Sequence, residues 1–362
     1  MMNIFEYLEK RDLEEIGEYP KEVDIFVLTC LSYTKFEFLF SSKKRRMRMT
    51  IGDYCYYYMK ASEENDFGKH SHLRLIMAIK DNPRYKDIPI IHLASSFDSA
   101  QEKQYASIAF RVGKKNIVLA FRGTDSTLVG WKEDINLALY DAIPSEIAAQ
   151  KTLDSLIMQH PLSRFYVAGH SKGGLLALYA ASHVFAKNQR HVSSVFEFDA
   201  PGLKDDQVYD DGYLNIVNRI HGYVPEECIV GLIFNKKHAI SVIKSSAKGL
   251  MQHDAFSWEI DGTRLLHLEE FYSRDAMKPG IINELRQHYS DEEMQQYIDS
   301  LYKIVKEDDD TATISNMLNK EKAKTVYHEY KKLDKSEKKI VKRITFKVIW
   351  NALWKKKKKS AK

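Results

Sequence analysis

The stretch FYVAGHSKGG, residues 165–174, decides how the rest of the sequence is interpreted. Its apolar beginning predicts a short buried strand, and the Ala- and Leu-rich sequence GGLLALYAASHVFAK after it predicts a helix. Ser171 stands between the two elements, with Gly169 and Gly173 on either side. A serine on such a turn projects its hydroxyl above the sheet, as a nucleophile requires. A tight turn without chemistry gives the same pattern, so the other parts of the chain must decide.

The elements around this turn indicate an α/β fold. The sequence YASIAFRVGKKNIVLAFRGTD predicts a β-hairpin whose turn is GKKN, residues 113–116. A helix is expected over residues 144–160 and another over 24–40, after a short N-terminal helix. Further strands are expected in SSVFEFDAPG, LNIVNRIHGYVP and KHAISVIKSS. Strands that alternate with helices predict a mostly parallel sheet covered by helices on both faces.

The composition is that of a globular protein, with 44% hydrophobic residues. The N-terminus alternates charged and apolar residues, so no signal peptide is expected, and no apolar run approaches the roughly 20 residues that span a bilayer. The three cysteines are far apart, which fits a reducing cytosol and predicts neither disulfides nor a zinc motif: Cys30, Cys55 and Cys228. We therefore expect a cytoplasmic protein without a metal or cofactor.

Near residue 276 the sequence changes in character. A capping box formed by Ser290 and Glu293 opens an amphipathic helical pattern, and lysine-rich helical sequence continues from there to the end. We place a domain boundary at this point. An α/β domain is expected in residues 1–275 and a helical extension in residues 276–362.

The end of the extension is strongly basic. Residues 331–362 contain fourteen Lys and Arg and two acidic residues, which gives this segment a net charge of +12. Because the net charge of the whole chain is +5, residues 1–330 have a net charge of −7. In ITFKVIWNALWKKKKK, residues 344–359, Trp350 and Trp354 precede the run Lys355–Lys359. This pattern is typical of a helix that lies in the interface of an anionic membrane, and a solvated basic terminus is the alternative. No nucleic-acid motif accompanies it, and the acidic remainder would repel phosphates.

Two further parts of a serine-hydrolase site occur in the expected chain order. The strand IVLAF ends at the turn formed by residues 122–124, and a loop after such a strand usually supplies the second donor of an oxyanion hole. His253 follows the last expected strand in a loop and is the candidate general base. The other histidines after Ser171 and before His253 are expected to be structural: His183, His191, His221 and His238.

These motifs resemble those of the class 3 (fungal-type) lipases, which are α/β-hydrolases. Their F-R-G-[ST] strand end, W-x-x-D element and G-H-S-x-G turn correspond to Phe121–Thr124, to Trp131 with Asp134, and to Gly169–Gly173. FDAPG, residues 198–202, is similar to their apolar-G-A-P segment. Over roughly residues 1–275 the chain resembles the Mbeg-like bacterial hydrolases still more closely.

The resemblance implies an α/β-hydrolase fold with Ser171 as nucleophile and His253 as base. It also implies that Thr124 and Lys172 supply the oxyanion hole. Arg122 and Asp134 would then support the loop after the strand, and the segment around Trp131 is where the resembling lipases keep a lid.

The acid of the triad is where the sequence departs from these lipases. Their D-x-V-P element corresponds to HGYVPEECIVG, in which Gly222 or Cys228 takes the place of the aspartate, depending on the alignment. The nearest carboxylates are Glu226 and Glu227, and Asp199 at the end of the preceding strand is the other candidate. We favour Glu227, and a Ser–His dyad with a neutral third partner is the remaining alternative.

The sequence thus predicts a serine hydrolase that cleaves carboxylic esters, with lipid or acylglycerol esters as the expected class, through an acyl-enzyme. The alternative is a hydrolase-fold protein with weak or no turnover that acts as a binding or scaffold module at an anionic membrane surface. The departure at the acid favours this alternative, whereas the serine turn, the oxyanion loop and the base favour the enzyme. The basic segment would allow a peripheral position at the inner membrane face.

Overall fold

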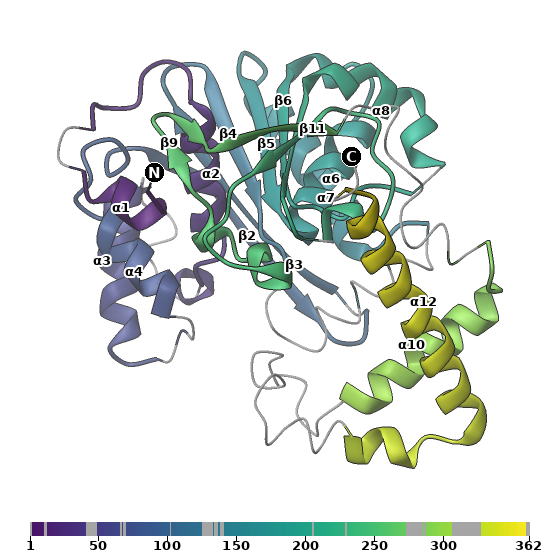
Figure 1. Cartoon of the computed structure of the whole chain (residues 1–362). Helices are drawn as coiled ribbons and strands as arrows, with labels where there is room; N and C mark the ends of the chain where they lie inside the picture. Colours follow the sequence, from purple (N-terminus) through teal and green to yellow (C-terminus); the bar gives the residue numbers. More distant parts are fainter. Residues whose placement is uncertain are drawn as a thin grey trace.

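Five parallel strands form the centre of a nine-stranded sheet (Figure 1). The strand order is β1-β2-β3-β4-β5-β6-β7-β8-β11, so consecutive strands of the chain lie side by side. Strands β4 to β8 are parallel, and β1, β2, β3 and β11 add antiparallel edges. This computed structural model describes residues 2–10, 13–40, 49–65, 67, 70–101, 103–124, 133, 137, 141–204, 206–228, 230–272, 285, 287–305 and 327–359.

The strands of the large sheet are β1 (Met49–Thr50), β2 (Pro89–Asp98), β3 (Lys103–Val112), β4 (Asn116–Phe121), β5 (Arg164–His170), β6 (Val192–Phe198), β7 (Ile220–Pro225), β8 (Ile240–Ile243) and β11 (His267–Tyr272). A two-stranded sheet pairs β9 (Ile260–Asp261) with β10 (Arg264–Leu265). The helices are α1 (Ile4–Leu8), α2 (Glu22–Leu31), α3 (Ile51–Ser62), α4 (His70–Ile79), α6 (Pro144–Gln159), α7 (Lys172–His183), α8 (Asp211–Ile216), α10 (Asp291–Val305) and α12 (Lys335–Lys359).

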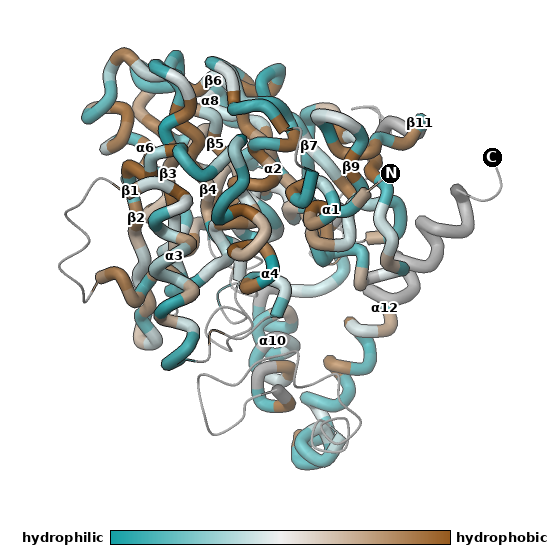
Figure 2. Tube along the Cα trace, turned by 90° about the vertical axis from the view of Figure 1, so that its left-hand side faces the viewer, coloured by the Kyte–Doolittle hydropathy of each residue, from teal (hydrophilic) through white to brown (hydrophobic). Residues whose placement is uncertain are grey.

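Helices cover both faces of the sheet, as the sequence predicts (Figure 1). Strand β4 shows why, because all of its residues are buried and its side chains alternate between two hydrophobic clusters. Val118 and Ala120 pack with residues of α1–α4, whereas Ile117, Leu119 and Phe121 pack with residues of α6–α8. Hydrophobic segments accordingly run through the sheet and α2 in Figure 2.

The expected hairpin is formed by β3 and β4, and Gly113 takes a positive φ of 58° in its turn. Two sequence expectations are wrong in part. The helix expected over residues 24–40 ends at Leu31, where the Ser32 and Thr34 hydroxyls donate to the Thr29 and Leu31 carbonyls. The strand expected from residue 214 begins only at Ile220, because the preceding residues form α8 and a 3₁₀ turn.

The helices α10 and α12 pack against each other and have a hydrophobic cluster of their own, separate from the two clusters on the sheet (Figure 1). The capping box expected at the start of α10 is present, since Ser290 and Glu293 exchange backbone-to-side-chain hydrogen bonds of 3.1 and 3.2 Å. In α12, Ile340, Val341 and Ile344 are buried in this cluster. Residue 276, where the sequence places the domain boundary, lies outside the described residues.

The beginning of the Trp- and Lys-rich segment therefore differs from the expectation. Ile344 is fully buried against α10, so it is not available to a membrane surface. Trp350, Trp354 and Lys355–Lys359 lie in α12, and their side chains are outside the described part of the chain. No helix among the described residues combines the length and the hydrophobicity of a membrane span.

Candidate active site

Ser171 sits on a sharp turn between β5 and α7, with φ 57° and ψ −130°. Residues 169 and 173 must lack a Cβ atom for this turn to pack as it does. A Cβ on Gly169 would lie 2.1 Å from the Gly173 carbonyl carbon, and a Cβ on Gly173 would lie 2.2 Å from the Phe121 carbonyl oxygen. The serine conformation itself costs of order 1–3 kcal/mol. The glycines of the motif are thus required by close packing of the turn against β4.

The imidazole of His253 lies within hydrogen-bonding distance of the Ser171 hydroxyl. Its Nε2 is 2.9 Å from Ser171 Oγ. His253 ends the 3₁₀ turn Gly249–His253, which follows β8, so it reaches the site from the carboxyl edge of the parallel strands. Its side chain is 28% exposed. The structure therefore brings together the serine and the histidine that the sequence singles out.

The carboxylate that contacts His253 is that of Asp199, immediately after β6. Asp199 Oδ2 lies 2.6 Å from His253 Nδ1, and its other oxygen accepts the Gly231 N–H at 2.9 Å. The residue has a positive φ of 47° and is held by a 2.7 Å bond from its own N–H to the Tyr223 carbonyl. A positive φ favours Gly, Asn or Asp, and the corresponding residue of the lipase apolar-G-A-P segment is the glycine.

The Asp199 carboxyl group is fully buried. Burial alone would raise its pKa, but the hydrogen bond and charge of His253, with smaller contributions from Cys228 and His170, bring the pKa below its ordinary value. The group is therefore a carboxylate at neutral pH. A buried carboxylate is an acceptor alone, so it fixes the hydrogen of the neutral His253 ring on Nδ1.

The two glutamates considered from the sequence lie elsewhere, which corrects the preference for Glu227 as the acid. The Glu227 carboxylate accepts the Gly249 N–H at 2.6 Å, at the start of the turn that carries His253. Glu226 forms an ion pair of 2.9 Å with Lys244 and is about one-third exposed. Both side chains are engaged by these groups, and Asp199 occupies the position next to His253.

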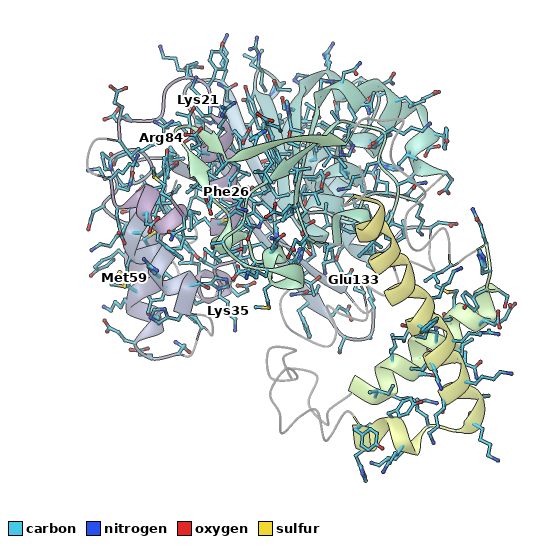
Figure 3. All side chains as sticks on the ribbon, in the orientation of Figure 1. Lys21, Phe26, Lys35, Met59, Arg84 and Glu133 are labelled. Carbon is cyan, nitrogen blue, oxygen red and sulfur yellow. The ribbon has the colours of Figure 1, made fainter. Side chains whose placement is uncertain are left out.

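The side chain of Lys172 points away from the serine. Its ammonium group is 2.8 Å from the Glu133 carboxylate and 3.0 Å from the Gln104 carbonyl, and both charged groups are buried. Glu133 also accepts N–H bonds from Gln104 and Ser145. It is labelled in Figure 3. What Lys172 can offer a substrate is therefore its backbone N–H at the start of α7, where the helix dipole favours negative charge.

The loop after β4 is held by Arg122 and leads to the other oxyanion candidate, Thr124. The Arg122 guanidinium donates to the Ser32 and Thr34 carbonyls at 2.7 and 2.8 Å and pairs with Glu37 at 2.6 Å. This agrees with the expected supporting role of Arg122. Trp131 and Asp134, and with them the candidate lid, lie outside the described residues.

His170 and Tyr33 support His253 and have no role assigned from the sequence. His170 Nε2 lies 2.8 Å from the His253 carbonyl oxygen, so this nitrogen carries the hydrogen. The other ring nitrogen of His170 lies 2.8 Å from the Tyr33 hydroxyl, which is also 3.0 Å from the His170 carbonyl oxygen. The two imidazole rings lie with centroids 4.6 Å apart. Because Tyr33 and His170 are 137 residues apart, no local pattern connects them.

Aromatic side chains pack next to the segments that carry Asp199 and His253. Phe26 of α2, labelled in Figure 3, lies edge-on to Phe198 and stacks on Trp258, each at 5.4 Å between centroids. Phe198 precedes Asp199, and the Trp258 indole N–H donates to the Gln252 carbonyl next to His253. A rigid apolar layer thus fixes the two loops that carry the acid and the base.

The four histidines between Ser171 and His253 have contacts typical of structural residues, as expected. His238 is buried between Tyr213 and Glu197, and His183 bonds the Tyr179 carbonyl one helical turn earlier. His191 bonds the Ser163 carbonyl at 3.3 Å, and His221 stacks on Phe196.

Several solved structures are similar to this chain, and they are fungal lipases. Lipase II from Rhizopus niveus is 18% identical, with 63% of this chain and 84% of that chain covered and a TM-score of 0.38. A Rhizomucor miehei lipase–propeptide complex is 15% identical over 70% and 74% of the two chains, with a TM-score of 0.38. A fungal lipase–inhibitor complex, described as a model for interfacial activation, is 15% identical over 60% and 77%, with a TM-score of 0.39. No curated protein matches the sequence.

A family model also matches the chain over one continuous range of residues. The model of the Mbeg1-like family matches residues 79–303, which include the strand β4, the serine turn, and the residues that carry Asp199 and His253. This span is more than half of the 362 residues. The chain therefore belongs to the Mbeg1-like family.

Proposed function

We propose that this protein is a serine hydrolase that cleaves carboxylic esters through an acyl-enzyme intermediate. The observation that carries the proposal is the continuous hydrogen-bonded line from Ser171 through His253 to Asp199, with distances of 2.9 and 2.6 Å. A hydroxyl within reach of a base, which is itself oriented by a third group, is the arrangement that activates serine as a nucleophile.

In the first half of the reaction Ser171 Oγ attacks the ester carbonyl carbon. His253 Nε2 has a free lone pair in this tautomer and accepts the hydroxyl proton, and Asp199 stabilises the imidazolium that forms. The imidazolium then gives the proton to the leaving alcohol. The acyl group remains on Ser171 as an ester.

In the second half water attacks the acyl-enzyme. His253 takes a proton from the water and returns it to Ser171 Oγ as the carboxylic acid leaves. In both halves negative charge develops on the former carbonyl oxygen. We propose that the backbone N–H groups of Lys172 and Thr124 stabilise this negative charge. In related enzymes, removal of one such donor raises the activation free energy by about 3 kcal/mol.

Among ester classes, we propose lipid or acylglycerol esters as substrates. Two features of the chain support this choice: the motifs resemble those of class 3 lipases, and the basic segment around Lys355–Lys359 is suited to anionic surfaces. The scaffold alternative was favoured by the lack of an acid at the position where the lipases carry theirs. Because the Asp199 carboxylate lies beside His253, this departure from the lipases no longer favours the scaffold alternative.

The test is hydrolysis of p-nitrophenyl esters of short, medium and long acyl chains by the full chain, with and without anionic vesicles. The wild-type protein should turn over, and Ser171→Ala should lower kcat by at least about 10³-fold. Ser155→Ala, a substitution on α6 outside the site, is the matched control and should leave kcat unchanged. A Ser171→Ala protein that hydrolyses as fast as the wild type would exclude the proposed nucleophile. A rate that rises with chain length and with vesicles would support lipid substrates.

A further inference from the structure

Cys228 lies beside the His253–Asp199 pair, at the ring nitrogen opposite to the one that faces Ser171. Its Sγ is 3.9 Å from His253 Nδ1. The donor atoms of Asp199, Cys228 and His253 all lie within 4.8 Å of one another. No other group of three His, Cys, Asp or Glu side chains is placed this way within the described parts of the chain. A thiol, an imidazole and a carboxylate together are a donor set that Zn²⁺ takes in proteins.

We propose that Asp199, Cys228 and His253 form a Zn²⁺ site whose occupation switches off the hydrolase. The existence of the site rests on the geometry of these three residues alone. Its inhibitory effect rests in addition on the proposed function, because it requires His253 to act as the base.

The three ligands come from the carboxyl ends of successive parallel strands. Asp199 follows β6, Cys228 follows β7 and His253 follows β8, and the backbone N–H of Gly231 already fixes one oxygen of Asp199. Asp199 and Cys228 are buried, whereas the His253 side chain is 28% exposed. An ion therefore reaches the cluster past His253, and the fourth ligand position is left to water.

The present distances need small changes to accept the metal. Tetrahedral Zn²⁺ with ordinary bond lengths places its ligand atoms about 3.3 to 3.6 Å apart. The Cys228–His253 distance of 3.9 Å must shorten by a few tenths of an ångström, and the 2.6 Å Asp199–His253 bond must open by about 0.7 Å. Rotations of the three side chains can provide both changes without movement of the strands.

Metal binding would remove the base from Ser171 by changing the tautomer of His253. In the hydrolytic state Nδ1 carries the hydrogen and Nε2 holds the lone pair that faces Ser171. Zn²⁺ takes the Nδ1 lone pair, so the hydrogen of the neutral ring moves to Nε2. Cys228 binds as the thiolate and releases one proton to solvent. The double charge of the ion then balances the thiolate and the Asp199 carboxylate, and Ser171 faces a donor instead of an acceptor.

The other two cysteines provide matched controls. Cys30 of α2 and Cys55 of α3 are buried in the hydrophobic cluster on one face of the sheet, where burial raises the pKa of both thiols. Within the described residues neither belongs to a group of three possible metal ligands. His70 at the start of α4 is exposed and serves as a control for metal bound at the surface.

The first experiment measures binding independently of turnover. Co²⁺ is added to the full-length wild-type protein as a spectroscopic substitute for Zn²⁺, and the near-ultraviolet thiolate-to-metal charge-transfer band is recorded. We expect one Co²⁺ per chain with this band, its displacement by Zn²⁺, and its loss in Cys228→Ser and Cys228→Ala but not in Cys30→Ala, Cys55→Ala or His70→Ala. A wild-type protein without the band, or a band that survives both Cys228 substitutions, would overturn the site.

The second experiment measures ester hydrolysis in Zn²⁺ buffered by a chelator, each variant being normalised to its own metal-free rate. We expect Zn²⁺ to inhibit the wild type reversibly, and the midpoint to rise at least about 10-fold in the Cys228 variants. An unchanged midpoint in these variants contradicts the inhibitory site. The two proposals can fail separately. If the protein hydrolyses esters but Zn²⁺ does not inhibit it, the inhibitory effect of the site is wrong and the proposed function stands. If the protein shows the Co²⁺ band but no hydrolysis, the metal site stands and the proposed function is wrong.

Discussion

Asp199 reaches His253 Nδ1 at 2.6 Å from the end of β6, one strand before the position at which the resembling lipases carry their acid. At the end of that next strand, β7, stands Cys228, 3.9 Å from the same nitrogen. The ends of two neighbouring strands thus converge on one imidazole. A carboxylate on either strand can orient the ring, so the loss of the aspartate on β7 is compatible with a complete triad.

Asp199→Asn is expected to lower kcat by about 10³- to 10⁴-fold, because an amide can donate to Nδ1 and so favour the wrong tautomer of His253. Glu226→Gln, which removes only a surface ion pair, is the matched control and should stay near wild type. Glu227→Gln should cost less than about 10-fold, since Glu227 contacts the backbone of the His253 turn and not its ring. Steady-state kinetics on one ester separates these outcomes. An active Asp199→Asn protein would show that the acid is another group.

Gly173→Ala should destabilise the fold by about 2 kcal/mol or more, because its Cβ would lie 2.2 Å from the Phe121 carbonyl oxygen and the turn or β4 must move. Gly17→Ala is the matched control, since nothing lies within 4 Å of a Cβ there. Urea denaturation gives both free energies of unfolding. Equal effects of the two substitutions would mean that the turn tolerates a side chain.

Glu146 gives the stability a pH dependence of defined sign. Burial, opposed in part by the hydrogen bond from the Ile143 N–H, raises the pKa of Glu146 to about 7. The folded protein then binds the proton more tightly than the unfolded chain, so this group's contribution to stability falls as pH rises from about 4.5 to 7. Glu146→Gln should therefore be more stable than wild type at pH 8 by about 3 kcal/mol, and close to it near pH 4.5.

The control for this substitution is Glu63→Gln, at an exposed position after α3. It should change the free energy of unfolding by less than about 0.5 kcal/mol at either pH. Urea denaturation at several pH values is the measurement. If the Glu146→Gln protein is less stable than wild type at pH 8, the buried carboxylate is stabilising and the sign given above is wrong.

Replacement of Lys355–Lys359 by glutamine should abolish sedimentation with anionic vesicles, because each lysine near such a surface contributes about 1 kcal/mol. Substitution is a cleaner test than truncation at residue 336, which would also remove Ile340, Val341 and Ile344 from the cluster with α10. Glutamine at the five lysines of residues 331–339 makes the same change of charge at the other end of the basic segment and is the control. Equal sedimentation of all three proteins would favour a merely solvated terminus.

The strands β4 to β6 and the serine turn could be predicted because their signals are local. Alternating or continuous apolar runs mark β4 to β6, and the spacing of Gly169, Ser171 and Gly173 marks the turn. The end of α2 at Leu31 was harder to predict from the sequence. It depends on side-chain hydrogen bonds of Ser32 and Thr34 and on Arg122, which lies about 90 residues further along the chain.

The acid was harder to predict from the sequence because its role depends on where two loops meet. Glu227 is closer in sequence to the expected position, but its carboxylate is used by Gly249. The one local signal for Asp199 was its place at the glycine of the apolar-G-A-P segment, where a positive φ aims the side chain at His253. Tyr33 and His170 meet across 137 residues, so only the fold reveals that contact.

The most direct test of the proposed nucleophile is covalent labelling of the folded full-length protein by a fluorophosphonate, followed by peptide mass spectrometry. The geometry of Ser171, His253 and Asp199 predicts one adduct per chain, on the peptide that contains Ser171. The adduct should be absent in Ser171→Ala and form much more slowly in His253→Ala. A folded wild-type protein that takes up no label, or that carries it on another residue, would contradict the assignment of Ser171 as the nucleophile.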